Sequence, residues 1–212
     1  MNVKNSILEL RGITVSYGDH TVISNFSMEL ERGELVAVTG VSGSGKTSLI
    51  RAILGFVPIE QGEILVDSIP VNAVEVRKHT AYLPQDLSFP CEWVDEVLRM
   101  PFSFRNNKDR KITEEQWLDC FGRLGLEDGI MKKRLNEISG GQRQRMMLAI
   151  ASMLDKDIII LDEPTSALDA ASVNLVTEYI KELSTRGKSV ISVTHDNVFA
   201  AACDKVIEVK SK

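Results

Sequence analysis

The hydrophobic and polar positions divide the chain into three regions of different periodicity. Up to about residue 83, short runs alternate apolar and polar residues, which predicts strands. The middle region repeats its apolar residues at helical spacing, with Thr113 placed to cap a helix, and the last third alternates apolar runs with amphipathic segments. Strands are expected at 7–10, 13–15, 21–30, 34–39, 62–66, 79–83, 158–161, 189–194 and 206–209, and helices at 46–54, 92–99, 114–124, 142–154 and 170–184.

The last third of the chain predicts a parallel sheet. Strands that alternate with helices at this spacing require helical crossovers, which join parallel strands. The four consecutive apolar residues of 158–161 suit a strand that is buried on both faces. The helical middle is then an insertion into this α/β fold. We expect one domain, with a core of about residues 1–85 and 155–212 and a helical subdomain of about residues 86–154.

Composition and charge narrow the class of protein. The 212 residues are 43% apolar and 26% charged, as in a globular domain, and no run approaches the ~18 apolar residues of a membrane span. The net charge of −5 argues against nucleic acid as the main ligand. Two basic runs, 105–111 and 132–134, are interpreted as solvated faces. Three separated cysteines indicate reduced thiols in the cytoplasm: Cys91, Cys120 and Cys203.

A glycine-rich segment between an expected strand and an expected helix predicts a nucleotide site. Residues 40–47 fit the pattern GxxxxGK[ST]. Glycine lets the backbone wrap a phosphate closely, and the helix N-terminus adds a favourable dipole. Lys46 can reach the β- and γ-phosphates of ATP, and the Thr47 hydroxyl can ligate Mg²⁺. The expected nucleotide contacts here are Gly40, Val41, Ser42, Gly43, Ser44, Gly45, Lys46, Thr47 and Ser48.

Two carboxylates follow the buried strand 158–161. Ligands of α/β sheets bind at the carboxyl ends of strands, where this strand delivers Asp162 and Glu163. Asp162 suits the Mg²⁺ coordination shell, and Glu163 is placed to polarise an attacking water molecule. An apolar run that ends in two acids is common, so this inference depends on the glycine-rich segment.

Residues 138–142, Ile-Ser-Gly-Gly-Gln, identify the family. They resemble the LSGGQ signature of ATP-binding-cassette (ABC) proteins, with Ile138 in place of leucine. The resemblance implies a P-loop ATPase fold with a mainly parallel sheet, an antiparallel β subdomain and the inserted helical subdomain. It also implies that two cassettes close head to tail, so that the signature of one contacts the ATP held by the other. The signature residues expected at that ATP are Ser139, Gly140, Gly141 and Gln142.

The resemblance covers the whole chain and implies roles for four more residues. Tyr17 corresponds to an aromatic that stacks on adenine, Gln85 to the Q-loop glutamine that touches Mg²⁺ and water, Asp169 to the D-loop, and His195 to the switch histidine. Taken singly, Tyr17 could be a strand aromatic, Asp169 a helix cap and His195 a structural residue. The implied catalytic set is Glu163, His195, Lys46 and Gln85, and the implied Mg²⁺ ligands are Thr47, Gln85 and Asp162.

The arrangement of the motifs favours the separate motor subunit of a transporter. The stretch between Lys46 and Ser139 has no room for a long coiled coil, only one set of motifs is present, and we expect no C-terminal regulatory domain after His195. The expected partners are a transmembrane permease and a second cassette, most simply in a homodimer at the inner face of the cell membrane, and no nucleic acid. A soluble cassette ATPase of an assembly or repair system and a non-hydrolysing nucleotide-binding module are the alternatives.

The same resemblance implies a groove that accepts a short helix of the permease. Its expected lining, which could equally be core, is 86–90, Trp93, Val97 and 100–102. Residues 101–106 also look similar to the ATPase of bacterial putative iron-export transporters. Generic export and lipoprotein-release cassettes are the competing interpretations.

Overall fold

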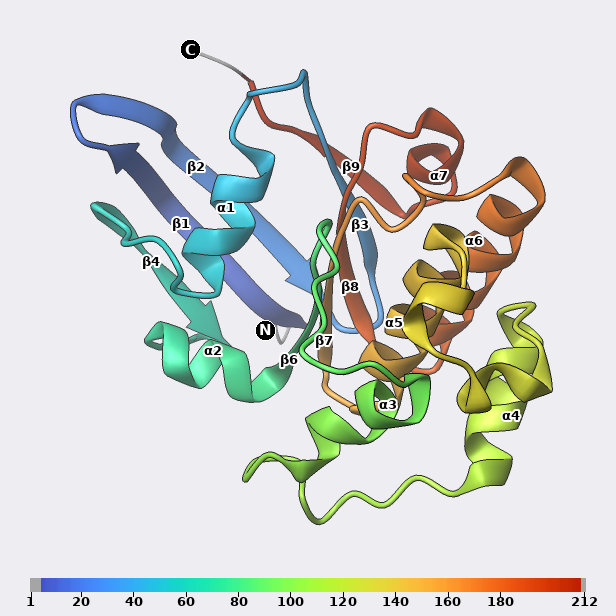
Figure 1. The fold of residues 1–212 in the computed structure, drawn as a ribbon. Coiled ribbons are helices and arrows are strands. Elements are labelled where there is room, and N and C mark those ends of the chain that lie inside the picture. Colours follow the sequence, from blue (N-terminus) through green and yellow to red (C-terminus); the bar gives the residue numbers. More distant parts are fainter. Residues whose placement is uncertain (1–4, 211–212) are drawn as a thin grey trace.

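The structure, a computed structural model, describes residues 5–210 and contains two sheets (Figure 1). The first is antiparallel and has the strand order β2-β1-β4-β5. It contains β1 (Ser6–Tyr17), β2 (His20–Glu31), β4 (Gln61–Val66) and β5 (Ile69–Pro70). The strands predicted at 7–10 and 13–15 form the single strand β1. Gly12, with a φ of 61°, lies where the pairing register of β1 shifts. The alternation of apolar and polar residues is therefore interrupted there, although the strand continues.

The second sheet is parallel throughout and has the order β6-β7-β8-β3-β9. Its strands are β3 (Leu35–Thr39), β6 (Thr80–Leu83), β7 (Ile158–Asp162), β8 (Ser189–Val193) and β9 (Lys205–Glu208). Every residue of β7 is buried, as predicted for a strand covered on both faces, and every residue of β8 is buried as well. The expected α/β class, with one parallel and one antiparallel sheet, is confirmed.

Helices cover both faces of the parallel sheet. Ile159 and Leu161 of β7 pack into a core with α5 (Gly140–Met153) and α6 (Ala170–Thr185). Ile158 and Ile160 point the other way, into a core shared with α1 (Lys46–Ile53) and the antiparallel sheet. Figure 1 shows α1 between the two sheets and α5 and α6 on the opposite side. Alternate side chains of β7 therefore pack into two different hydrophobic cores, one on each face of the sheet.

The middle of the chain forms α3 (Val94–Ser103), α4 (Glu114–Arg123) and the 3₁₀ turns 128–132 and 135–137. Thr113 caps α4 as predicted, accepting a hydrogen bond from the Gln116 amide. Trp117 is buried between Phe102 and Phe121, with ring centroids 5.9 and 5.7 Å away. No helix of residues 5–210 combines the length and apolarity needed to cross a membrane.

Two short helices and several boundaries differ from the sequence prediction. The structure adds α2 (Ala73–His79) and α7 (Asn197–Ala201), and β6 begins only at Thr80 because His79 ends α2. Helix α3 continues past the predicted end at 99 and contains Pro101. Of the two alternatives for Val97, groove lining or core, the structure confirms the core. Trp93 is 39% exposed, with the Arg134 guanidinium 4.8 Å from its ring centroid.

Candidate functional site

The phosphate loop leaves β3 and enters α1 through glycines that no other residue could replace without strain. Gly40 has a φ of 148°, and a Cβ there would lie 2.5 Å from the carbonyl oxygen of Val209. Gly45, with a φ of 95°, precedes the first residue of α1, and a Cβ there would lie 2.7 Å from Cγ1 of Val22. These close approaches fix the path of the loop at the N-terminus of α1, where free backbone amides favour an anion.

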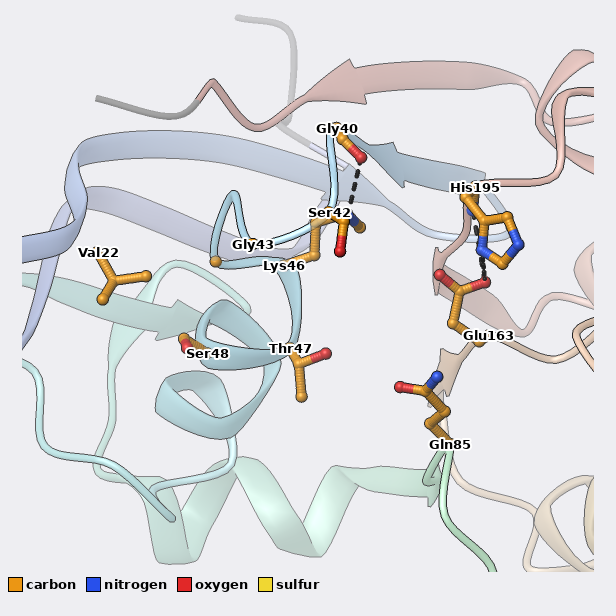
Figure 2. A pocket seen from close by; sticks show the side chains of 11 residues that line it. Val22, Gly40, Ser42, Gly43, Lys46, Thr47, Ser48, Gln85, Glu163 and His195 are labelled. Carbon is orange, nitrogen blue, oxygen red and sulfur yellow. Dashed lines mark hydrogen bonds and ion pairs between the residues drawn. The ribbon is translucent and has the colours of Figure 1, made fainter.

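A cavity of about 600 Å³ opens at this loop. Its lining combines the loop with side chains from the ends of three neighbouring parallel strands, β6, β7 and β8 (Figure 2). The carboxyl edge of an open α/β sheet is where such proteins bind ligands. The lining residues are Val22, Gly40, Ser42, Gly43, Gly45, Lys46, Thr47, Ser48, Gln85, Glu163 and His195.

Val22 is the one lining residue that the sequence did not suggest. It lies on β2, after Tyr17 and outside every motif, and reaches the cavity because the antiparallel sheet packs beside α1. Its alternating position in a strand carries no signal of a binding role.

Lys46 supplies a buried positive charge at the centre of the loop. Its ammonium donates hydrogen bonds to the carbonyl oxygens of Gly40 at 2.8 Å and Val41 at 3.0 Å. The side chain is only 9% exposed, so its charge acts in a partly desolvated cavity where attraction to an anion is strong.

Asp162 lies behind Thr47 and is buried. Burial and the negative charge of Glu163 raise the pKa of Asp162 to about 6, although the hydrogen bond with the Thr47 side chain and the nearby Arg51 and Lys46 oppose the shift. Its Oδ1 atom is buried without a hydrogen-bond partner among residues 5–210. An unpaired buried carboxylate oxygen is unfavourable unless a cation compensates it, so these residues fit a bound metal ion.

Glu163 and His195 form the opposite wall of the cavity. The His195 Nδ1 atom lies 2.7 Å from Oε2 of Glu163, and the His195 backbone amide donates to the same oxygen at 3.4 Å. Figure 2 shows this pair facing Lys46 across the cavity. The histidine is exposed and the carboxylate is almost fully buried, so His195 holds the acid in one orientation from the solvent side.

The backbone of Glu163 is strained, with a φ of 54°. Such a conformation costs on the order of 1–3 kcal/mol in a residue with a side chain, and it occurs preferentially at functional sites. The Glu163 amide donates to the Val193 carbonyl at 2.9 Å, while its own carbonyl accepts from the Gln144 side chain at 3.2 Å and the Ser166 hydroxyl at 3.1 Å. These contacts hold the conformation, and Gln144 is a supporting residue that no motif indicated.

The predicted signature residues begin α5 and do not line the cavity of their own chain. Ser139 is the N-cap, accepting from the Gln142 amide at 3.1 Å, while its own amide donates to the Gln142 side chain at 2.8 Å. Gly141 packs closely on the segment before α6, since a Cβ there would lie 3.1 Å from the Ala167 carbonyl oxygen. Ser139 and Gly140 are exposed, so this helix N-terminus faces outward.

Besides Asp162, four more predicted residues lie outside the cavity lining. Tyr17 is nearby, because its hydroxyl lies 3.3 Å from the Ser48 hydroxyl at the rim. Asp169 caps α6, accepting from the Ser172 amide at 2.8 Å, so the alternative structural role is confirmed. Val41 is exposed, and the Ser44 hydroxyl is buried without a partner within residues 5–210.

Comparison with known proteins decides the family. The model of the ABC transporter family matches residues 23–166, which span the phosphate loop, the signature and Glu163. The chain belongs to the ABC transporter ATP-binding family. It is 32% identical to the manganese transport system ATP-binding protein MntB of Listeria monocytogenes, over 97% of this chain and 87% of that protein. It is 34% identical to the glutamate/aspartate import ATP-binding protein GltL of Escherichia coli K12, over 92% and 83%.

The fold of this ABC ATPase agrees with solved cassettes. The chain superposes with a TM-score of 0.83 on the dimeric, post-hydrolysis structure of the ATP-binding cassette MJ0796 bound to ADP and Pi. The two sequences are 26% identical, and the match covers 97% of this chain and 96% of that one. The sequence prediction of an ABC ATPase is thereby confirmed.

Proposed function

We propose that this ABC ATPase hydrolyses ATP in the cavity at residues 40–47 and drives a separate transmembrane permease. The observation that carries the proposal is the pairing of His195 with Glu163 in the same cavity as Lys46. A loop that binds phosphates needs no carboxylate beside it, whereas hydrolysis requires a group that accepts a proton from water.

ATP would bind with its phosphates in the loop and its adenine beside Tyr17, whose ring is half exposed and whose hydroxyl contacts Ser48. Asp162, Thr47 and Gln85 would hold a Mg²⁺ ion. Within residues 5–210 there is no three-member cluster of His, Cys, Asp and Glu, and Mg²⁺ needs none when phosphates and water complete its shell. The ion, when bound, supplies positive charge to the β- and γ-phosphates.

In the hydrolytic step, a water oxygen attacks the γ-phosphorus while the bond to the β-γ bridging oxygen breaks. Glu163 accepts a proton from the water, and the products are ADP and inorganic phosphate. His195 keeps the carboxylate aimed at the water, and Lys46 stabilises the charge on the phosphoryl oxygens. The chain contributes mainly position and electrostatics.

A second copy would complete the site. The N-terminus of α5 faces outward, and its residues Ser139, Gly140 and Gly141 do not line the nucleotide cavity of their own chain. Facing the γ-phosphate of a second cassette, it would supply a helix dipole and backbone donors from the side opposite the loop. Asp169, at the start of α6, would lie at the same interface.

Coupling to the permease would pass through the segment after Gln85. We propose that the helical subdomain, about residues 86–154, turns about Gln85 against a core of about 1–85 and 155–212 when the γ-phosphate leaves. The relatives' names specify manganese, glutamate/aspartate and, for the MacB protein of Mannheimia succiniciproducens, macrolide export by an ATP-binding/permease protein. Such varied cargo fits a motor that does not itself contact the cargo.

An affinity pull-down from solubilised native membranes, with the ATPase rate recorded before and after, tests this function. We expect recovery of a multi-span protein that increases the rate of hydrolysis, with the chain located at the inner face of the membrane. Recovery of soluble partners alone, with ATPase activity intact, would contradict the transport function and favour an assembly or repair system.

A further inference from the structure

A second cavity, of about 350 Å³, lies at the amino end of β6, where Thr80 lines it, whereas the nucleotide cavity lies beyond the carboxyl end of this strand at Gln85. It is enclosed by α2, the segment after α3 and the connection between α5 and β7, in the lower part of Figure 1. Three cations line it, Arg77, Arg105 and Lys156, and its lining among the described residues includes no carboxylate. In a chain whose net charge is −5, such a concentration of positive charge needs an explanation.

The neighbouring acids do not neutralise these cations. Both oxygens of Asp155 are engaged elsewhere, one by Arg110 at 2.7 Å and the other by Lys188 at 2.6 Å. Asp157 lies 3.7 Å from Nδ1 of His79. Neither Arg105 nor Lys156 forms an ion pair or a side-chain hydrogen bond with any residue of the described range 5–210.

Arg77 is fixed in place and keeps donors free. Its Nη1 atom donates to the Leu54 carbonyl at 2.5 Å, so the guanidinium is anchored to the end of α1 while its remaining N–H groups can donate elsewhere. Asn107 is anchored in the same way, because its Nδ2 donates to the Pro101 carbonyl at 3.0 Å. The cavity therefore has fixed polar groups as well as the two unpaired side chains.

We propose that this cavity binds a phosphate ester, distinct from the ATP of the phosphate loop. Arginine and lysine match the charge of phosphate, and the arginine fork can hold two of its oxygens. Asn106 adds a neutral donor at the same lining, and Phe104, 56% exposed, forms an apolar rim beside the charges. The volume is in the range of ligand clefts, which begin at about 300 Å³, so the phosphate can carry a small organic group.

Two sources share this chemistry. If the ligand is a phospholipid head group, Phe104 would lie in the membrane interface beside the cations. A soluble phosphate ester would bind the same cations with no membrane present. The basic run 105–111, interpreted from the sequence as a solvated face, thus contributes Arg105 to a cavity.

The test compares two variants that change the charge equally. Arg105→Gln with Lys156→Gln removes the unpaired cations of the cavity. Lys108→Gln with Lys111→Gln is the matched control, because both side chains are exposed and neither lines the cavity. The natural protein and both variants are titrated with inorganic phosphate while NMR records the shift of each backbone amide. In a second experiment, their binding to phosphatidylcholine vesicles is measured with and without phosphatidylglycerol. Following individual amides separates this cavity from the phosphate loop, whatever the fate of the proposed ATPase activity.

Amide shifts at 104–107 and 156 on adding phosphate, lost only in the cavity variant, would support a soluble ester. Binding to phosphatidylglycerol vesicles that falls roughly 30-fold only in the cavity variant would support a lipid, since each basic residue at an anionic surface contributes roughly fivefold. An equal loss in the control variant would overturn the proposal. So would the absence of both effects in the natural protein.

Discussion

At the scale of single residues, the site combines two groups that lower the folding stability of the protein without its ligands. Glu163 has a strained backbone, and Asp162 is a buried carboxylate with an unpaired oxygen. We expect each to become favourable if a cation and a phosphate bind in the cavity. This pattern is expected where function sets the residue.

The raised pKa of Asp162, about 6, makes a prediction about stability and pH. In the unfolded chain the carboxyl titrates near ~3.9, so the folded state holds the proton more tightly. The stability that the folded state gains by holding this proton is complete below about pH 4, and it is lost as the pH rises through about 6. Without nucleotide, Asp162→Asn should therefore be more stable than the natural protein at pH 7, by on the order of 2 kcal/mol, and equal to it near pH 4.

Urea unfolding at the two pH values measures this difference. Asp169→Asn is the control, because hydrogen bonds from Ser172 lower the pKa of Asp169, and asparagine can replace it as a cap. The control should not gain stability at pH 7. If Asp162→Asn were less stable than the natural protein at pH 7, the carboxylate would not be the unfavourable group described here.

At the scale of elements, a short helix cap lies beside the residues that we propose to be catalytic. Asp196 caps α7, accepting from the amides of Val198 at 2.8 Å and Phe199 at 3.2 Å, and its other oxygen accepts from the Thr165 hydroxyl at 3.1 Å. The same aspartate thus links α7 to the segment that follows Glu163. It directly follows His195, so the cap also fixes the end of β8 from which the histidine projects.

We predict that Asp196→Ala lowers the free energy of unfolding by about 1–2 kcal/mol, the usual cost of losing a helix cap. Asp196→Asn, which retains an acceptor for the two amides, should lose only a small part of this. Chemical denaturation of both variants gives the comparison. Equal losses in the two variants would mean that the charge of Asp196, not its capping bonds, stabilises the element.

Elements whose signal is local were predictable, and those that depend on contacts were not. The phosphate loop, β7 and the cap at Thr113 each follow from a few adjacent residues. Helix α2 buries only Val76, so no apolar period indicates it, although Asn72 and Glu75 form a capping signal. Likewise, α7 is too short for an apolar period, and a capping residue, Asp196, is the local signal that its sequence offers.

At the scale of the molecule, the site residues separate into two groups. The first comes from β3, β6, β7 and β8, whose carboxyl ends meet, and the sheet order brings these residues into one cavity. The second is the signature at the start of α5, which faces outward. The motif order in the sequence indicated both groups, but only the fold separates what one chain completes from what it leaves for a partner.

This separation predicts how the molecule assembles. If the outward signature completes the site of a second copy, binding of ATP should join two chains, and hydrolysis should release them. If Glu163 is the proton acceptor that we propose, Glu163→Gln should then trap the joined form, since the variant keeps Lys46 and the phosphate loop but cannot accept the proton.

Sedimentation equilibrium of Glu163→Gln, with and without MgATP, measures this directly. We expect a monomer without nucleotide and a dimer with MgATP, and the same variant carrying Ser139→Arg should remain a monomer because the bulky cation blocks the signature. A Glu163→Gln protein that binds MgATP fully and stays monomeric would contradict the account of a site completed by a second chain.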